Sequence, residues 1–279
     1  MHRKEVRILR IFKIFIAEIL RMLRDRKWLY LLIIAVVYIV ICRMFASYRY
    51  KLDLDYGVEM RFGESAFKIW QFTMDSMQMG VLLYVLPPMV YVLSYMNDRK
   101  EKVDQYICVK SQSDVYYAIK YVVAILGGMI LNFLFVTLLY LPLYQIIASH
   151  VYRIDDLDRV NTLVGPYLKS DKATVAVLLI AAEGAMIGGI CAAMSFILSM
   201  WLENRILVTV LPYISFRILR NTIYMWQLPK KIVNLAMINV DTGFYDRPVG
   251  QYFDTFAIWM LIFGILFFVS YFVNIRRKR

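Results

Sequence analysis

Glu183 is the only acidic residue inside the long apolar stretches of this chain, which makes it the first candidate for chemistry. An ionisable group at membrane depth costs at least about 2.5 kcal/mol and normally faces protein or water. Two interpretations of Glu183 stay open: its carboxylate lines a substrate path, or it is protonated or hydrogen-bonded where two helices meet. Pro87 and Pro88, which should bend an apolar helix, and Arg217 are the further candidates for such a path.

Small residues recur at every fourth position around Glu183. One row holds Ala181, Ala185, Gly189 and Ala193, and a second row holds Gly184, Gly188 and Ala192. Rows of this kind let membrane helices approach one another closely. We therefore expect tight helix packing along this segment.

Catalytic motifs are missing from the sequence. It contains no GxxxxGK[ST] pattern, so we do not expect the chain to bind a nucleotide as a P-loop ATPase. It contains no HExxH pattern, and its only histidines, His2 and His150, fall on opposite sides of the predicted membrane domain, which argues against a zinc protease. A membrane enzyme would need several acid–base groups at one depth, and only Glu183 qualifies. We therefore expect a chain that is not an enzyme and that holds no metal and no cofactor of its own.

Six apolar stretches must position these residues. Three of them, residues 76–97, 121–149 and 255–275, carry no charge and exceed the roughly 20 residues that a helix needs to cross a bilayer. The predicted fold class is an all-α membrane protein with six transmembrane helices that form one domain from residue 28 to residue 279. The predicted spans are residues 28–47, 76–97, 119–149, 173–202, 204–219 and 255–275.

The fifth span is the least regular of the six. Its uncharged run, residues 206–216, is too short to cross a membrane unaided. A largely apolar segment, residues 221–240, follows it and contains a turn signal at Gln227-Leu228-Pro229. We favour a short span with a short helical cap between spans five and six. The alternative is a longer, tilted helix from which Arg217 reaches outward.

The distribution of charge predicts the orientation in the membrane. With six spans, one side holds both termini, residues 97–118 and residues 203–205, with eighteen Lys and Arg against eight Asp and Glu. The loops 48–75, 150–172 and 218–254 on the other side carry twelve of each sign. Basic residues stay in the cytoplasm during insertion, so both termini are predicted to be cytoplasmic. A cationic collar against anionic lipids explains the net charge of +12, and no nucleic acid partner is expected.

Residues 1–27 are predicted to form an amphipathic helix that lies on the membrane. In a helix of 3.6 residues per turn, one side holds Ile8, Phe12, Phe15, Ile16, Ile19, Leu20 and Leu23. The other side holds Arg3, Arg7, Arg10, Lys13, Arg21 and Arg24. This pattern is typical of an interfacial helix whose basic face meets lipid phosphates. The alternative is that the segment is only an orientation signal.

The loop at residues 97–118 combines dense charge with one apolar stripe. Val103, Tyr106, Ile107 and Lys110 fall at the spacing of one helix face, which predicts a short cytoplasmic helix. Such a helix suits docking into a groove on a soluble partner, and the alternative is a solvated loop that packs on its own protein. Ser111, with Asp114 three residues later, matches an N-cap pattern at the start of span three.

This arrangement resembles the ABC-2 type permeases, the membrane subunits of one class of ABC transporter. The order of a basic interfacial helix, two spans, a charged cytoplasmic helix before span three and a structured segment between spans five and six is similar to theirs. The closest local match is the acidic and basic run Asp98–Lys102 followed by Ser113–Lys120, in which aromatic residues precede a lysine that enters span three. Lys110-Ser111 stands where proline is usual, and the glycine often found after the charged cluster is missing.

The resemblance implies a division of labour between subunits. Two permease chains, identical or homologous, would form the membrane unit, and two copies of a separate ATPase subunit would bind ATP and Mg and dock from the cytoplasm. The short cytoplasmic helix predicted within residues 97–118 would be the coupling helix. It would contact that ATPase through Arg99, Lys102, Val103, Tyr106, Ile107 and Lys110. The small residues of span four and the bent span two would be candidates for the seam between two permease chains.

The function implied by the resemblance is export driven by the partner ATPase. The expected substrate is amphipathic, a lipid or a peptide, and self-protection against an antimicrobial peptide is one example. The expected location is a bacterial inner (plasma) membrane, with several passes and with membrane lipids as further partners. The alternative function is a non-transporting membrane sensor or scaffold whose cytoplasmic loop binds a regulator.

Overall fold

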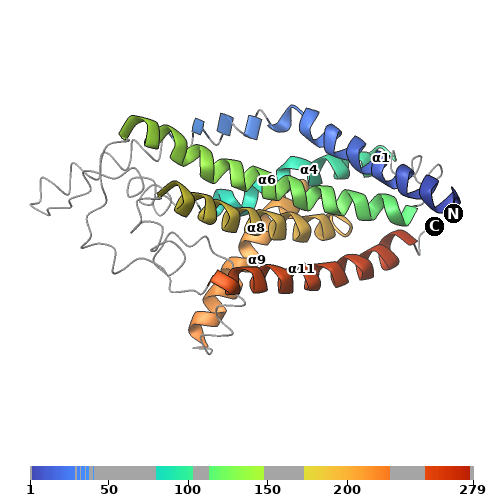
Figure 1. The fold of residues 1–279 in the computed structure, drawn as a ribbon. Coiled ribbons are helices and arrows are strands. Elements are labelled where there is room, and N and C mark those ends of the chain that lie inside the picture. Colours follow the sequence, from blue (N-terminus) through green and yellow to red (C-terminus); the bar gives the residue numbers. More distant parts are fainter. Residues whose placement is uncertain are drawn as a thin grey trace, which may run out of the picture.

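A computed structural model describes residues 2–28, 30–31, 33–34, 36–37, 40, 80–102, 113–147, 173–226 and 249–276. Its main elements are α1 (His2–Arg24), α4 (Gly80–Lys100), α6 (Ser113–Ile147), α8 (Ala173–Ser199), α9 (Arg205–Met225) and α11 (Val249–Tyr271), and a π-helical turn, Phe272–Arg276, follows α11. The described residues contain no strand, which confirms the all-α prediction. Both termini lie at the same end of the molecule (Figure 1).

Four of these helices are long and apolar enough to cross a membrane. They are Val115–Leu138 in α6, Val177–Ser199 in α8, Arg205–Ile223 in α9 and Phe253–Asn274 at the end of the chain. The chain is therefore a membrane protein by length and composition of its helices. The helix α4 coincides with the second predicted span, but prolines, tyrosines and polar residues lower its hydropathy. Most of the first predicted span lies outside the described residues, so the count of six spans stays a prediction.

The helix α8 lies at the centre of the bundle. It contacts α4, α6, α9 and α11, and it runs beside α6 along the molecule (Figure 1). Its neighbours cover it on several sides, so α8 is the most buried of the four candidate spans and α11 is the least buried. The segment that carries Glu183 is thus the core of the fold.

Glycines make the contact between α6 and α8 unusually close. A Cβ atom at Gly188 would lie 2.3 Å from the carbonyl oxygen of Gly128, and a Cβ atom at Gly128 would lie 2.5 Å from the carbonyl oxygen of Gly188. No side chain fits there, because both obstacles are backbone atoms. Gly189 of the first small-residue row faces Met129, also on α6. The expected tight packing is confirmed, but these glycines pack within one chain and are not open to a second copy.

The helices α4 and α9 each contain a proline whose freed carbonyl group accepts a hydrogen bond from a side chain of a neighbouring helix. Pro87 leaves the Leu83 carbonyl without its helical donor, and Asn132 Nδ2 donates to this oxygen at 2.8 Å. The same amide donates to the Gly184 carbonyl at 3.0 Å, so Asn132 joins α4, α6 and α8. In the same way, Ser195 Oγ on α8 donates to the Val208 carbonyl at 2.8 Å, which Pro212 leaves free in α9.

The fifth span is longer than the predicted one. We expected a span that ends near residue 219, but α9 continues through Arg217 and Arg220 to Met225. In length α9 agrees with the longer alternative, since no helix breaker follows Pro212 before Pro229 and Ser195 satisfies the carbonyl group that Pro212 leaves free. The tilt of that alternative stays a prediction. The cap was predicted within residues 221–240, of which residues 227–240 lie outside the described residues.

The helix α1 docks on the bundle with part of its apolar surface. Its residues Phe15, Ile19 and Met22 pack against the core, and Met22 lies against Gly127 of α6. A second part of this surface stays exposed, including Phe12 (58% exposed) and Leu23 (52% exposed). The helix ends at Arg24 as the sequence predicted within three residues, and its position on a membrane surface stays a prediction.

Candidate functional site

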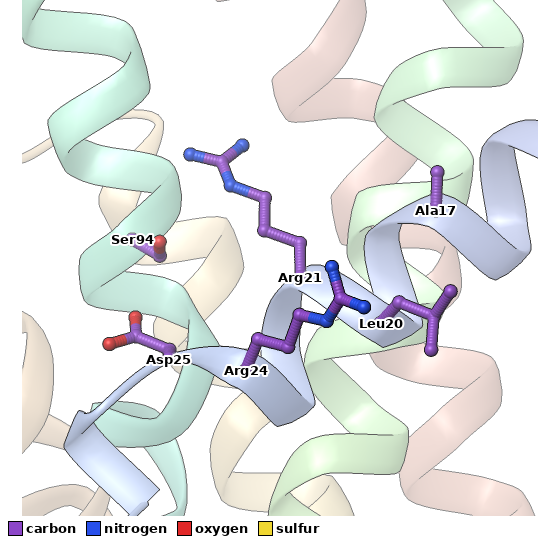
Figure 2. A pocket seen from close by; sticks show the side chains of 6 residues that line it. All are labelled: Ala17, Leu20, Arg21, Arg24, Asp25 and Ser94. Carbon is purple, nitrogen blue, oxygen red and sulfur yellow. The ribbon is translucent and has the colours of Figure 1, made fainter.

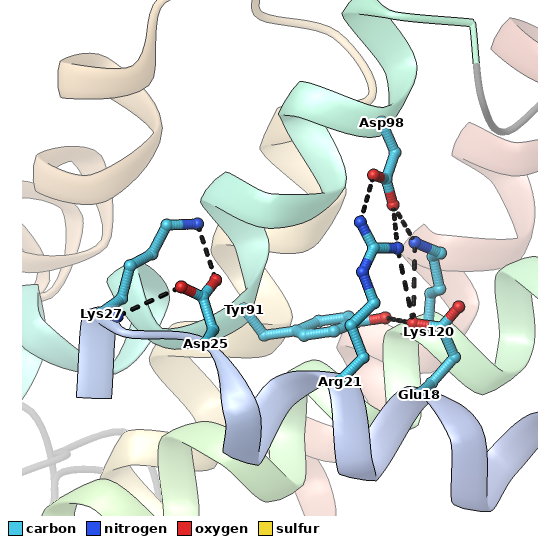
Figure 3. Close-up of polar contacts among 7 residues, drawn as sticks. All are labelled: Glu18, Arg21, Asp25, Lys27, Tyr91, Asp98 and Lys120. Atoms are coloured by element: carbon cyan, nitrogen blue, oxygen red, sulfur yellow. Dashed lines mark hydrogen bonds and ion pairs between the residues drawn. The ribbon is translucent and has the colours of Figure 1, made fainter. Parts of the chain in front are cut away.

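Five polar side chains from three helices meet beside the start of α6, at the end of the molecule that holds both termini (Figure 3). We call this group the charge cluster, and it consists of Glu18 and Arg21 from α1, Tyr91 and Asp98 from α4, and Lys120 from α6. Glu18, Asp98 and Lys120 are 7%, 3% and 0% exposed. The cluster is therefore a buried ionic site that depends on contacts between distant parts of the chain.

Asp98 is the acceptor at the centre of the charge cluster. Arg21 donates to both oxygens of its carboxylate, at 2.7 Å from one nitrogen and 2.5 Å from the other. Lys120 Nζ donates to the same carboxylate at 2.5 Å. A planar guanidinium group and a planar carboxylate can form two parallel hydrogen bonds. This pairing fixes the orientation of Arg21 and Asp98 and the distance between them. Asp98 thus ties α1 and α6 to the end of α4.

Glu18 completes the charge balance of the cluster. It accepts a hydrogen bond from the Tyr91 hydroxyl group, and its carboxylate lies 3.8 Å from Lys120 Nζ and 3.9 Å from Arg21. Two carboxylates thereby face two cations, so the buried group carries no net charge when all four are ionised. A buried charge without such partners would be strongly destabilising.

Aromatic rings surround the ammonium group of Lys120. Its Nζ atom lies 5.6 Å from the ring centroid of Tyr91, 5.8 Å from that of Tyr95 and 5.0 Å from that of Tyr116. The electron-rich faces of these rings attract a cation in a site with little water. The rings explain in part how a lysine with no exposed surface remains in the fold.

The partners of Asp98 favour its charged form. Burial acts to raise the pKa of Asp98, but the hydrogen bonds and charges of Arg21 and Lys120 outweigh burial and hold this pKa below its ordinary value. The hydrogen bond to Asp98 in turn raises the pKa of Arg21 above its ordinary value. Asp98 is therefore a charged anchor that holds α1, α4 and α6 together.

The sequence analysis missed most of this cluster as a site. Arg21 was assigned to the lipid-facing basic side of the N-terminal helix, whereas its guanidinium group turns to Asp98. A usable signal was Glu18, a charged residue placed between Phe15 and Ile19 on the apolar side of an amphipathic helix. A charge in that position predicts a buried partner, but the pattern alone does not say which one.

Arg99 makes contacts within the chain that were not predicted, and its predicted contact with an ATPase stays a prediction. We expected it on a separate coupling helix, but it belongs to the last turn of α4. Its Nη1 atom donates to the carbonyl oxygens of Ser199 at 2.7 Å and Met200 at 3.0 Å. These carbonyl groups lie at the end of α8, where a cation also meets the negative end of the helix dipole. Arg99 therefore fastens α4 to α8.

The predicted coupling helix does not begin at residue 99. The helix α4 ends at Lys100, and Lys102 takes a left-handed backbone with φ of 57°. The residues Val103, Tyr106, Ile107 and Lys110, which were expected to contact an ATPase, lie outside the described residues, as does Ser111. Arg99 thus belongs to α4, and Lys102 belongs to the turn that follows α4.

Glycine at position 102 is expected to stabilise the protein. A left-handed conformation costs an L-residue roughly 1–2 kcal/mol, and glycine avoids most of this cost. We expect Lys102→Gly to raise the free energy of unfolding by about 1 kcal/mol relative to the parent, measured by thermal unfolding in detergent. Lys102→Ala is the matched control, because it removes the charge but keeps Cβ. An equal gain in both variants would show that charge, not the backbone, limits stability there.

The predicted path residues occupy two different environments. Glu183 is 5% exposed on α8, and Pro87 and Pro88 are buried on α4, which packs on α8. Arg217 is exposed on α9 and does not share this buried location. Among the residues that the structure describes, no group of three metal-binding side chains comes together.

Comparison with known proteins adds no family to this description. Neither the protein-family models, nor the curated proteins, nor the solved structures gave a match to the chain. The charge cluster and the helices that it joins are therefore the basis of the functional proposal.

Proposed function

We propose that this chain is the membrane-spanning permease subunit of an ABC transporter of the ABC-2 type. The observation that carries the proposal is the way in which α4 and α6 are anchored on either side of residues 103–112. Asp98 and Arg99 hold the end of α4, and Lys120 holds the start of α6. A force applied to the segment between them would reach α1 and α8 as well.

This anchoring suits a chain that is moved from the cytoplasm by another protein. The cluster joins α1, α4 and α6 through Asp98, and Arg99 adds α8. Packed elements of this kind move together and do not deform separately. A partner that pulls on the segment after Lys102 would therefore shift four helices, including the one that carries Glu183.

The proposed partner is an ATPase subunit in two copies, which binds ATP and Mg and supplies the energy that this chain does not generate. A second permease chain, identical or homologous, completes the membrane unit. The proposed activity is export of an amphipathic, lipid or peptide substrate across a bacterial inner membrane, with both termini cytoplasmic. Glu183 remains the candidate for contact with the substrate, because it is the acidic residue within the central helix.

The test is purification of the tagged full chain from its native membrane in mild detergent. We expect a P-loop ATPase to copurify, and mass measurement should give two permease chains with two ATPase chains. The double variant Tyr106→Ala with Ile107→Ala should insert normally and lose the ATPase or its substrate-stimulated activity, since interface energy concentrates in such apolar anchors.

Three outcomes would contradict the proposal. A functional complex with one permease chain and no homologous second chain would exclude the dimer. Copurification of a regulator without any ATPase would favour a sensor or scaffold instead. Normal substrate-stimulated hydrolysis in the double variant, with the complex intact, would show that residues 103–112 do not couple the two subunits.

A further inference from the structure

An open pocket lies between α1 and α4, next to the charge cluster, with which it shares Arg21 (Figure 2). Its volume is about 650 Å³, and its lining consists of Ala17, Leu20, Arg21, Arg24, Asp25 and Ser94. This volume is within the range of pockets that hold small organic groups. Arginine, serine and leucine side chains in one pocket offer both hydrogen-bond donors and apolar surface.

The two arginines of this pocket differ in their partners. Arg21 is held by Asp98 through two hydrogen bonds, so its remaining N–H groups have a fixed position. Arg24 lies one turn later on α1 and has no hydrogen bond or ion pair with any residue in the described ranges. Arg24 is therefore the cation of the pocket that is available to a ligand.

The acidic group in the lining does not cancel this charge. The carboxylate of Asp25 lies 3.1 Å from Lys27 Nζ, and its other oxygen accepts a hydrogen bond from the Lys27 backbone N–H at 3.1 Å. Asp25 is thus already paired with a cation, as Asp98 is with Arg21 and Lys120. The charged groups around the pocket leave Arg24 in excess, so an anion is the ligand that fits.

Exposed apolar side chains at the edge of the pocket indicate the source of this anion. Leu20 lines the pocket and is 46% exposed, while Ile16 and Leu23 on the neighbouring turns of α1 are 39% and 52% exposed. A soluble phosphate would leave this apolar surface in water. The acyl chains of a lipid would cover it while the headgroup reached the arginines.

We infer that this pocket binds the phosphate group of an anionic phospholipid. Arg24 and the free N–H groups of Arg21 contact the phosphate oxygens, because guanidinium groups match phosphate in charge and geometry. Ser94 offers a hydroxyl group from α4, and Leu20 meets the first carbons of the acyl chains. Such a lipid would bridge α1 and α4 beside the charge cluster.

The experiment compares lipid retention by the full chain in detergent, measured by native mass spectrometry. The probes are phosphatidylglycerol and phosphatidylcholine, added at equal concentration. We expect the parent chain to retain phosphatidylglycerol at least about tenfold better, which corresponds to about 1.4 kcal/mol. Arg24→Gln should remove this preference. Arg26→Gln is the matched control, because Arg26 is an exposed arginine two residues away that does not line the pocket.

Three results would overturn the inference. Equal loss of preference in Arg24→Gln and Arg26→Gln would show a general surface charge without a site. Displacement of the lipid by millimolar inorganic phosphate or glycerol phosphate would show a site for soluble phosphate. No preference in the parent chain would show that no anionic lipid binds. None of these readouts involves an ATPase, so they do not depend on the proposed transport function.

Discussion

Replacing Lys120 by methionine is expected to lower the free energy of unfolding by about 3–5 kcal/mol, the usual cost when one partner of a buried ion pair is removed. Methionine fills a similar volume but leaves two buried carboxylates with the single cation Arg21. Asp98 would keep its hydrogen bonds with Arg21, while Glu18 would retain the Tyr91 hydroxyl group and its longer contact with Arg21 at 3.9 Å. The docking of α1 should weaken with the cluster, because Glu18 and Arg21 are its polar attachments to the bundle.

Two readouts separate the loss of docking from general unfolding. Thermal unfolding in detergent reports stability, and the rate of trypsin cleavage within α1 reports its release from the bundle. Lys13→Met is the matched control, since Lys13 is exposed on the same helix and belongs to no described ion pair. The double variant Glu18→Gln with Lys120→Met restores neutrality and should recover part of the loss. Additive losses in the double variant would mean that Glu18 and Lys120 are not coupled.

Replacing Gly188 by alanine should destabilise the chain by about 3 kcal/mol, at the upper end of the cost of overpacking. The new Cβ atom would meet the Gly128 carbonyl oxygen at 2.3 Å, and a backbone atom inside a helix cannot turn away. Separation of α6 from α8 would also strain the hydrogen bonds of Asn132 to Leu83 and Gly184. The expected sign is notable, because alanine in place of glycine normally stabilises a helix by about 1 kcal/mol.

The control for this prediction is Gly264→Ala in α11. A Cβ atom there would have no neighbour within 4 Å, so only the gain in helix propensity should remain. Thermal unfolding of the two variants in the same detergent should therefore shift in opposite directions. Stabilisation of both variants by similar amounts would contradict the close backbone approach of α6 and α8.

The local features of this protein could be predicted from its sequence. The predicted apolar stretches overlap α6, α8 and α11, with ends that differ by up to six residues, because a helix that crosses a membrane must be apolar over a length set by the bilayer. The rows of small residues around Gly188 predicted close packing, because small side chains leave room for a neighbouring backbone. These properties depend on residues near one another in the chain.

Only the tertiary structure decided which charges meet and where α9 ends. Arg21 and Asp98 are 77 positions apart, and nothing local distinguishes Arg21 from Arg24, although one is held by a carboxylate and the other lines the pocket. The length of α9 likewise depended on Ser195 of another helix, which satisfies the carbonyl group that Pro212 leaves free. The pairing of Arg21 and the length of α9 both depend on residues distant in sequence, because a buried charge or carbonyl group is stable only where the fold supplies its partner.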